Sequence, residues 1–227
     1  METGLFKGTR EMIFRNLTIQ PITRLSAGML GLALCLQFAQ GRAFAQSDAD
    51  IAAARKTLED AAAKFRALIK DIDEAQWNFK SGPRAHSVGD EAEHVALSEQ
   101  ELQYVIGKAV TDPAKPDRAK VLGAKERTLR KLLLEGEQKA ERYKPPRKLK
   151  TKSEVLEYFN TAHAKALTLL RTTPHLGAHV HTHPVKEYGD LTALQWFYYM
   201  AYHNLKHCMQ IEQMMAHQDF PKTGGTD

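Results

Sequence analysis

Cysteine is scarce in this chain of 227 residues, which contains only Cys35 and Cys208. Cys35 falls in an N-terminal stretch that has the features of a cleaved leader, as described below. The mature chain would then keep Cys208 alone, so no intramolecular disulfide can form even in an oxidising compartment. Its stability must come from packing or from packing together with a bound metal.

A strongly basic surface is also missing once the first 45 residues are set aside. Those residues carry five Lys or Arg side chains and two acidic ones, so their removal lowers the formal net charge from +5 to +2. No stripe of Lys and Arg interleaves with aromatic residues in the remainder. Nucleic-acid binding, which depends on such a surface, is therefore not expected.

Strand patterns, internal repeats and low-complexity tracts are almost entirely absent. The chain is 43% hydrophobic and 26% charged, which suits one globular domain with a substantial core. Four long segments carry apolar residues at helical spacing, at about residues 47–72, 87–110, 153–171 and 190–217. Ser47 and Ser87 are typical helix caps, and Asp90 completes a capping-box pattern with Ser87. These features predict an all-α bundle of four main helices.

A short extra helix is expected between the second and third main helices. Residues 121–138 carry a narrow stripe of leucines surrounded by charged side chains, between Pro116 and the Pro145-Pro146 pair. Because a charged surface of this kind usually faces solvent, we expect this helix on the outside of the bundle.

Residues 1–45 have the pattern of a secretory signal peptide. An uncharged apolar run at residues 25–38 follows Arg24. The run is followed by Ala43, Phe44 and Ala45, which fit the small-residue cleavage pattern before Gln46. We therefore expect a mature domain of residues 46–227 that is periplasmic or secreted.

The apolar run is shorter than the roughly 20 residues that a membrane-spanning helix needs. No stable membrane anchor is therefore expected after cleavage of the signal peptide. The leader is unusually long, so translation can begin at Met1 or at Met12.

Two histidines share an otherwise apolar face of the last predicted helix. His203 and His207 are four residues apart, a spacing that places their side chains one above the other. Buried imidazoles need partners, and a divalent cation can bind two of them from one helical face. The spacing alone does not distinguish a metal site from hydrogen-bonded core histidines. Asn204 follows His203 where the zincin motif has glutamate, so the helix-borne general base of that class is missing.

A third ligand must come from a neighbouring element, and His94, near the start of the second predicted helix, is the best candidate. Three protein ligands leave at least one coordination position for water or substrate, which is the layout of a reactive site. Zinc, nickel and iron all suit three imidazoles, so the identity of the metal stays open. No general base can be assigned, although Glu91, Glu93 and Tyr202 are close in sequence to the expected ligands.

The other histidines have plainer interpretations as well as functional ones. His163, on the third predicted helix, is either a satisfied core histidine or a further ligand or hydrogen-bond donor. His179, His181 and His183 alternate as on a strand, but no strand scaffold is evident. We expect a surface loop near the mouth of the pocket there, with a second metal site as the alternative. Cys208 and the two tryptophans, Trp77 and Trp196, are expected to pack in the core.

The order of several residues resembles the DinB family, over most of the chain from about residue 51 to residue 221. The residues that carry the resemblance are Trp77, Pro83, Ser87, Val88, His94, Pro184, Gly189, Asp190, Leu191, Thr192 and the closing His-x-x-x-His-x-x-Gln-Ile motif from His203 to Ile211. Members of that family are four-helix bundles that hold a divalent metal with one histidine from the second helix and two from the fourth. The resemblance implies that His94, His203 and His207 are the ligands.

The same resemblance implies two classes of function. The family includes metal-dependent transferases of low-molecular-weight thiols, relatives of the maleylpyruvate isomerases, and members without known activity. The predicted signal peptide departs from the cytoplasmic members and argues against a cytosolic thiol cofactor. We expect either a metal-dependent transferase or hydrolase that acts on a small molecule, or a non-catalytic metal- or ligand-binding module. A homodimer is compatible with either class.

Overall fold

The computed structural model describes residues 47–122, 125–135, 145, 147–184 and 186–222. The predicted signal peptide lies outside these described residues, and so do residues 123–124 and 136–138 of the predicted extra helix. Within the described ranges, no helix combines the length and the apolar character that crossing a membrane requires.

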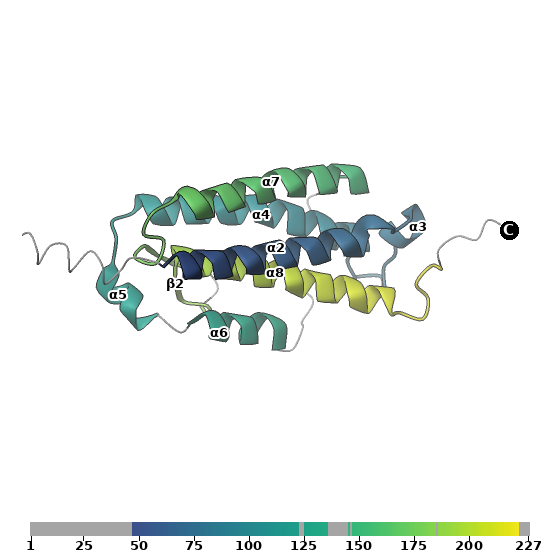
Figure 1. Ribbon diagram of the computed structural model, residues 1–227. Coiled ribbons are helices and arrows are strands. Elements are labelled where there is room, and N and C mark those ends of the chain that lie inside the picture. Colours follow the sequence, from purple (N-terminus) through teal and green to yellow (C-terminus); the bar gives the residue numbers. More distant parts are fainter. Residues whose placement is uncertain (1–46, 123–124, 136–144, 146, 185, 223–227) are drawn as a thin grey trace, which may run out of the picture. The chain divides into compact units, whose positions relative to one another are not determined.

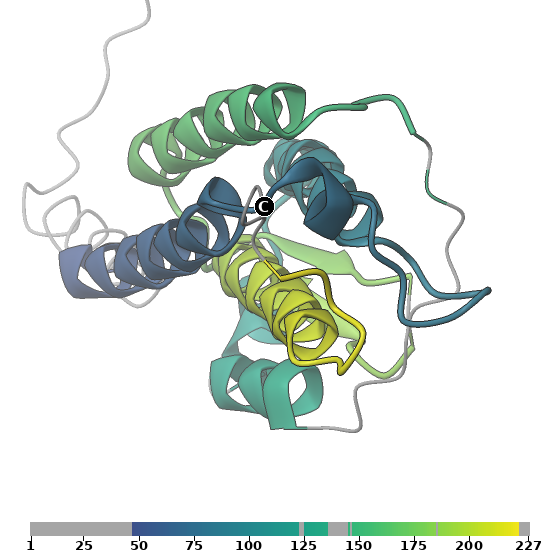
Figure 2. The same ribbon diagram turned by 90° about the vertical axis from the view of Figure 1, so that its right-hand side faces the viewer.

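Four long helices form a bundle, as the sequence predicts. They are α2 (Asp48–Lys70), α4 (Val88–Thr111), α7 (Lys152–Thr172) and α8 (Ala193–Met215). Helices α2 and α4 each pack against both α7 and α8, so the four helices surround a shared core (Figure 2). The prediction of an all-α four-helix bundle is confirmed.

Each main helix begins with a capping box, which satisfies two of the backbone N–H groups that a helix start leaves without partners. In α4 the Ser87 hydroxyl accepts from the N–H of Asp90 at 3.0 Å, and the Asp90 carboxylate accepts from the N–H of Ser87 at 2.9 Å. The other three boxes pair Ser47 with Asp50, Thr151 with Glu154, and Thr192 with Gln195. These caps fix the residues at which the histidine-bearing helices α4 and α8 begin.

Shorter helical segments connect the long ones. Helix α3 (Glu74–Trp77) precedes α4, and α5 (Pro116–Val121), α6 (Lys125–Arg130) and the π-helical segment η1 (Lys131–Glu135) lie between α4 and α7. Helix α6 runs beside α8 outside the four-helix arrangement (Figure 1), which confirms the predicted extra helix. The leucine stripe of this region is more deeply packed than a charged surface helix suggests, because Leu129 of α6 and Leu133 of η1 are buried in the core.

A two-stranded antiparallel sheet was not expected from the sequence. Strand β1 (Val180–Thr182) pairs with β2 (Asp190–Thr192), with His181 opposite Leu191. The fourth helix was predicted to begin at Asp190, but it begins at Ala193. Thr192 has extended backbone angles and is the helix N-cap, and Gly189, at φ 58°, turns the chain into β2.

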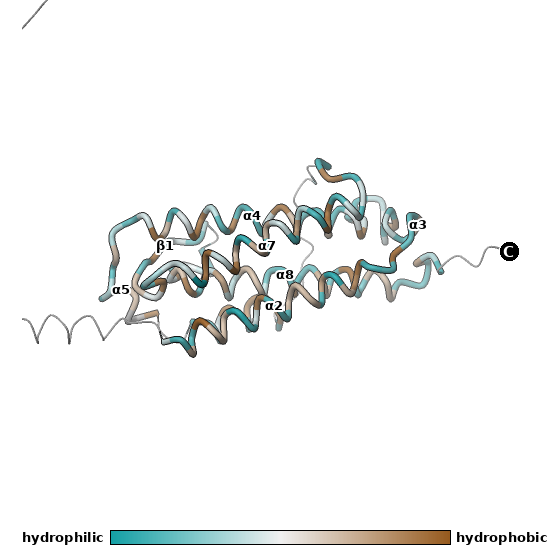
Figure 3. The backbone as a smooth tube through the Cα atoms, turned by 45° about the horizontal axis from the view of Figure 1, so that its top comes forward, coloured by the Kyte–Doolittle hydropathy of each residue, from teal (hydrophilic) through white to brown (hydrophobic). Residues whose placement is uncertain are grey.

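Polar side chains divide the apolar core. One apolar cluster contains Trp196 and Phe197, and a second contains Phe65 and Phe159. Hydrophobic and hydrophilic residues alternate along the helices (Figure 3), as expected for helices with one buried side. Between the two clusters lies a buried polar layer, made of Glu99, His163, His203, Asn204 and His207. Because buried polar groups are normally hydrogen-bonded, each of these side chains needs a partner from a neighbouring helix.

Candidate metal centre

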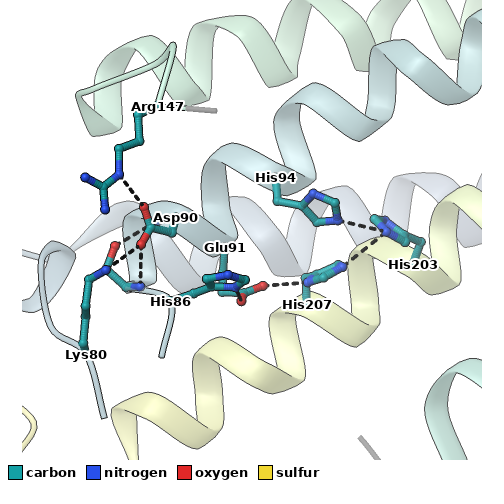
Figure 4. Close-up of polar contacts among 9 residues, drawn as sticks. Lys80, His86, Asp90, Glu91, His94, Arg147, His203 and His207 are labelled. Carbon is teal, nitrogen blue, oxygen red and sulfur yellow. Dashed lines mark hydrogen bonds and ion pairs between the residues drawn. The ribbon is translucent and has the colours of Figure 1, made fainter. Parts of the chain in front are cut away.

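The three predicted histidines come together between α4 and α8. The Nε2 atom of His203 lies 3.3 Å from Nε2 of His94 and 3.2 Å from Nε2 of His207 (Figure 4). A nitrogen of each ring lies within 4.8 Å of the other two, so the group could hold a metal ion. Helical spacing explains the pair on α8, and the packing of α4 against α8 supplies His94.

The donor set fits a cation better than it fits internal hydrogen bonds. Nε2 of His203 carries either one hydrogen or one lone pair. It can therefore form a full hydrogen bond with only one of the two neighbouring Nε2 atoms at a time. A cation would use all three lone pairs at once. Ligand distances of about 2.0–2.1 Å in tetrahedral geometry place imidazole nitrogens about 3.3 Å apart, close to the separations around His203. Among the described residues, no further His, Cys, Asp or Glu joins this group.

Burial keeps His203 in the neutral form that binds cations. His203 and His207 are buried, whereas His94 is only partly buried. Burial, followed by the neighbouring His207 and His94, lowers the pKa of His203 well below its ordinary value. His203 is therefore neutral at physiological pH, with a lone pair to offer. Its Nδ1 atom has no hydrogen-bond partner within the described part of the chain.

Glu91, one turn before His94 on α4, orients His207. Its Oε2 atom lies 2.7 Å from Nδ1 of His207, and its Oε1 atom lies 2.8 Å from Nδ1 of His86. Burial alone would raise the pKa of Glu91, but its hydrogen bonds and electrostatic interactions with His207 and His86 outweigh burial and lower it. An ionised carboxylate can only accept, so Nδ1 of His207 donates and its Nε2 keeps the lone pair that faces His203.

His163 belongs to a separate hydrogen-bond network centred on Glu99 of α4. Its Nδ1 atom lies 2.7 Å from Oε1 of Glu99, and Nδ2 of Asn204 donates to Oε2 of Glu99 at 2.8 Å. Glu99 is 0% exposed, so this carboxylate links α4, α7 and α8 in the core. His163 is therefore a hydrogen-bonded core histidine, and it is not part of the three-histidine group.

Two residues that sequence proximity suggested as bases are engaged elsewhere. Glu93 is buried, and it accepts backbone N–H groups from Arg147 at 2.9 Å and Leu149 at 2.8 Å. The Tyr202 hydroxyl donates to Glu126 on α6. Neither side chain is directed at the three histidines. Of the three suggested groups, only Glu91 contacts one of them.

The His-rich segment is partly a strand and partly core, so the expectation of a surface loop is wrong for this part of the chain. His181 lies in β1, and His183 is buried against Trp196, with stacked rings whose centroids are 5.0 Å apart. His179 contacts the backbone oxygen of Asp112 through Nδ1 at 3.1 Å. In the described ranges these histidines form no second metal-type group. Trp196 packs in the core, as expected.

Comparisons with known proteins agree with this architecture. Among solved structures, the chain is similar to one described as "YfiT from Bacillus subtilis is a probable metal-dependent hydrolase with an unusual four-helix bundle topology". The TM-score is 0.51 and the sequence identity 14%, over 75% of this chain and 88% of that one. At this identity the likeness shows the fold alone. Among curated proteins, no sequence matches the chain. The sequence model of the DinB superfamily matches residues 57–211, well over half of the chain, and the protein therefore belongs to that superfamily.

Proposed function

We propose that this protein binds one divalent cation through His94, His203 and His207 and uses it in the hydrolysis of a small molecule. The observation that carries the proposal is the convergence of three Nε2 atoms, at 3.2 and 3.3 Å around His203. Zinc, nickel and iron are the candidate cations, because each binds neutral imidazole.

A cation bound there would supply Lewis-acid chemistry, which generates a nucleophile at neutral pH and polarises a substrate oxygen. The protein's own groups would prepare that site. His203 stays neutral because it is buried, and Glu91 holds the hydrogen of His207 on Nδ1. His94 is only partly buried, whereas His203 and His207 are buried. The group is therefore more open to solvent on the side of His94. Three protein ligands also leave a position for the substrate.

Hydrolysis is favoured over thiol transfer for two reasons. The similar Bacillus subtilis protein is described as a probable metal-dependent hydrolase. In addition, the signal-peptide pattern of residues 1–45 would place the mature chain in the periplasm or outside the cell, away from cytosolic thiol cofactors. Water is the acceptor that is available in every compartment.

A non-catalytic metal-binding module is the second candidate, and one observation favours it. Glu93 and Tyr202 are bound to other parts of the fold, and Glu91 is bound to His207. Within the described residues, these contacts leave none of the suggested general bases uncommitted beside the histidines. In such a module the cation would stabilise the packing of α4 against α8.

Metal content and activity distinguish the two candidates. Protein purified without chelator would be analysed for metals, stripped, and reloaded separately with zinc, nickel and iron. Each form would then be assayed against a panel of small esters, amides and lactones. Hydrolysis that follows metal loading and is lost in the His94/His203/His207 triple alanine variant supports the enzyme. Full metal binding without hydrolysis on any of these substrates supports the binding module.

Export is a separate part of the proposal. If residues 1–45 are a signal peptide, protein recovered from the periplasm or the medium should begin at Gln46. Intact-mass measurement of the recovered chain tests this directly, and a mass that includes residues 1–45 would contradict it.

A further inference from the structure

His86 extends the polar contacts of the candidate metal centre toward the protein surface. It lies in the segment between α3 and α4, one residue before the N-cap Ser87. Its side chain is 14% exposed, and its Nδ1 atom lies 2.8 Å from Oε1 of Glu91, whose other oxygen contacts His207. A continuous series of contacts therefore runs from His86 through Glu91 to His207 (Figure 4).

We propose that His86 and Glu91 are positioning residues that set the cation affinity of the metal centre. This inference rests on the proposed function, because it concerns the same three histidines. Glu91 would act on His207 directly, and His86 would act through Glu91. Loop residues before α4 would thus contribute to metal binding although no metal ligand lies among them.

The geometry gives each contact a distinct effect. Oε2 of Glu91 accepts the Nδ1 hydrogen of His207, which fixes the ring orientation and leaves Nε2 for the cation. The negative charge of Glu91 also makes that nitrogen a stronger donor to a cation. His86 occupies the second oxygen. Without it, a buried carboxylate oxygen loses its partner, and the carboxylate is free to rotate away from His207.

A purely structural role is the competing explanation, and the chain itself illustrates it. Glu99 and His163 form a similar buried contact, with Nδ1 of the histidine 2.7 Å from a carboxylate of α4, yet His163 is not part of the three-histidine group. Such a pair stabilises helix packing alone. The test must therefore measure cation affinity separately from the stability of the metal-free fold.

Calorimetric titration of zinc into metal-free protein makes that separation. Replacement of a residue that orients a metal ligand typically weakens metal affinity by about 10–100-fold. We expect a loss in this range for Glu91→Gln, which keeps the shape but removes the charge, and about tenfold for His86→Ala. His86→Asn should recover much of the affinity, because its amide nitrogen can replace Nδ1 as the donor to Glu91.

Lys80→Ala is the matched control. Lys80 lies in the same loop and contacts Asp90 of α4 at 3.1 Å, without contacting a histidine of the group. Its removal loosens the loop by one ion pair and should leave zinc affinity unchanged. Thermal unfolding of each metal-free variant would show how much stability each change costs.

Nuclear magnetic resonance of the zinc-loaded protein supplies a signature that stability does not. The hydrogen on Nδ1 of His207 should give a downfield signal in the wild type and in Lys80→Ala, and the signal should shift upfield in His86→Ala and in Glu91→Gln. Equal zinc affinity and an unmoved signal in His86→Ala would overturn the inference. Failure of the wild type to bind zinc, nickel or iron would overturn the proposed function instead. If Glu91→Gln does not fold, the two His86 variants carry the test.

Discussion

Nε2 of His94 on α4 lies 3.3 Å from Nε2 of His203 on α8, across 109 positions of sequence. This contact brings two imidazoles together where α4 packs against α8. Three convergent imidazole nitrogens cannot satisfy one another, so the metal-free fold leaves hydrogen-bonding capacity unused there. A cation bound by all three nitrogens would use this capacity and would link α4 to α8.

Zinc should therefore stabilise the fold. A ligand that binds only the folded state adds about 2.7 kcal/mol to the free energy of unfolding when its free concentration is 100 times its Kd. The midpoint of thermal unfolding should rise with zinc in the wild type and in His181→Ala, because His181 lies in β1 outside the three-histidine group. His203→Ala should lose the rise, and an equal rise in that variant would contradict the site.

His163→Leu should be strongly destabilising. Glu99 is 0% exposed and divides its oxygens between His163 and Asn204, so the change leaves one oxygen of a buried carboxylate without a partner. Leaving a buried hydrogen-bonding group without its partner typically costs about 1–3 kcal/mol, and more when the group is charged. Urea unfolding measures the loss. Tyr104→Ala, at a side chain 76% exposed, should stay within about 0.5 kcal/mol of the wild type. A loss below about 1 kcal/mol in His163→Leu would contradict the importance of the Glu99 network.

Gly89→Ala should also destabilise the protein, because a Cβ atom at this position would lie 2.5 Å from Nε1 of Trp77. Overpacking of this kind typically costs about 1–3 kcal/mol. Gly107→Ala is a control in the same helix, since nothing lies within 4 Å of its added Cβ. There alanine should stabilise α4 by about 0.5–1 kcal/mol. Chemical unfolding should show a lower free energy of unfolding for Gly89→Ala and a higher one for Gly107→Ala. Equal changes in the two variants would count against the packing of Trp77 on α4.

Acid should weaken the start of α4. Burial would raise the pKa of Asp90, but the N–H of Ser87 and the charge of Lys80 outweigh burial and hold it below its ordinary value. A lowered carboxyl pKa adds stability that is complete above the unfolded value of about 3.9 and is lost as pH falls below it. Asp90→Asn should therefore be about 1 kcal/mol less stable than the wild type at pH 7, with a smaller difference near pH 3. Unfolding measured across this range would contradict the prediction if the difference stayed constant.

Helical periodicity and capping residues were enough to predict the four main helices, because both signals are local. Ser87 and Asp90 occupy the predicted capping positions. The pairing of β1 with β2 was not predictable in the same way. Each strand is three residues long, too short for an alternating pattern, and the pairing depends on the turn at Gly189 and on burial of Leu191.

The candidate site was predictable only in part. The spacing of His203 and His207 indicates a shared face from sequence alone. His94 was the best candidate for the third ligand from its place near a helix start, and the family resemblance strengthened that choice, because helix packing decides which residue faces the pair. Glu91 was suggested only by its closeness to His94. Its contact with His207 spans 116 positions of sequence, and no local pattern encodes a contact of that range. His86 carries no sequence signal of its role.

X-ray absorption at the metal edge of the loaded protein would show directly which residues hold the cation. In protein loaded with zinc, we expect three imidazole nitrogens at about 2.0–2.1 Å from the metal and at least one further light-atom ligand. His94→Ala should reduce the imidazole count by one, and so should His207→Ala. A spectrum with sulfur in the coordination shell, or with an imidazole count that these substitutions leave unchanged, would contradict a metal centre built from His94, His203 and His207.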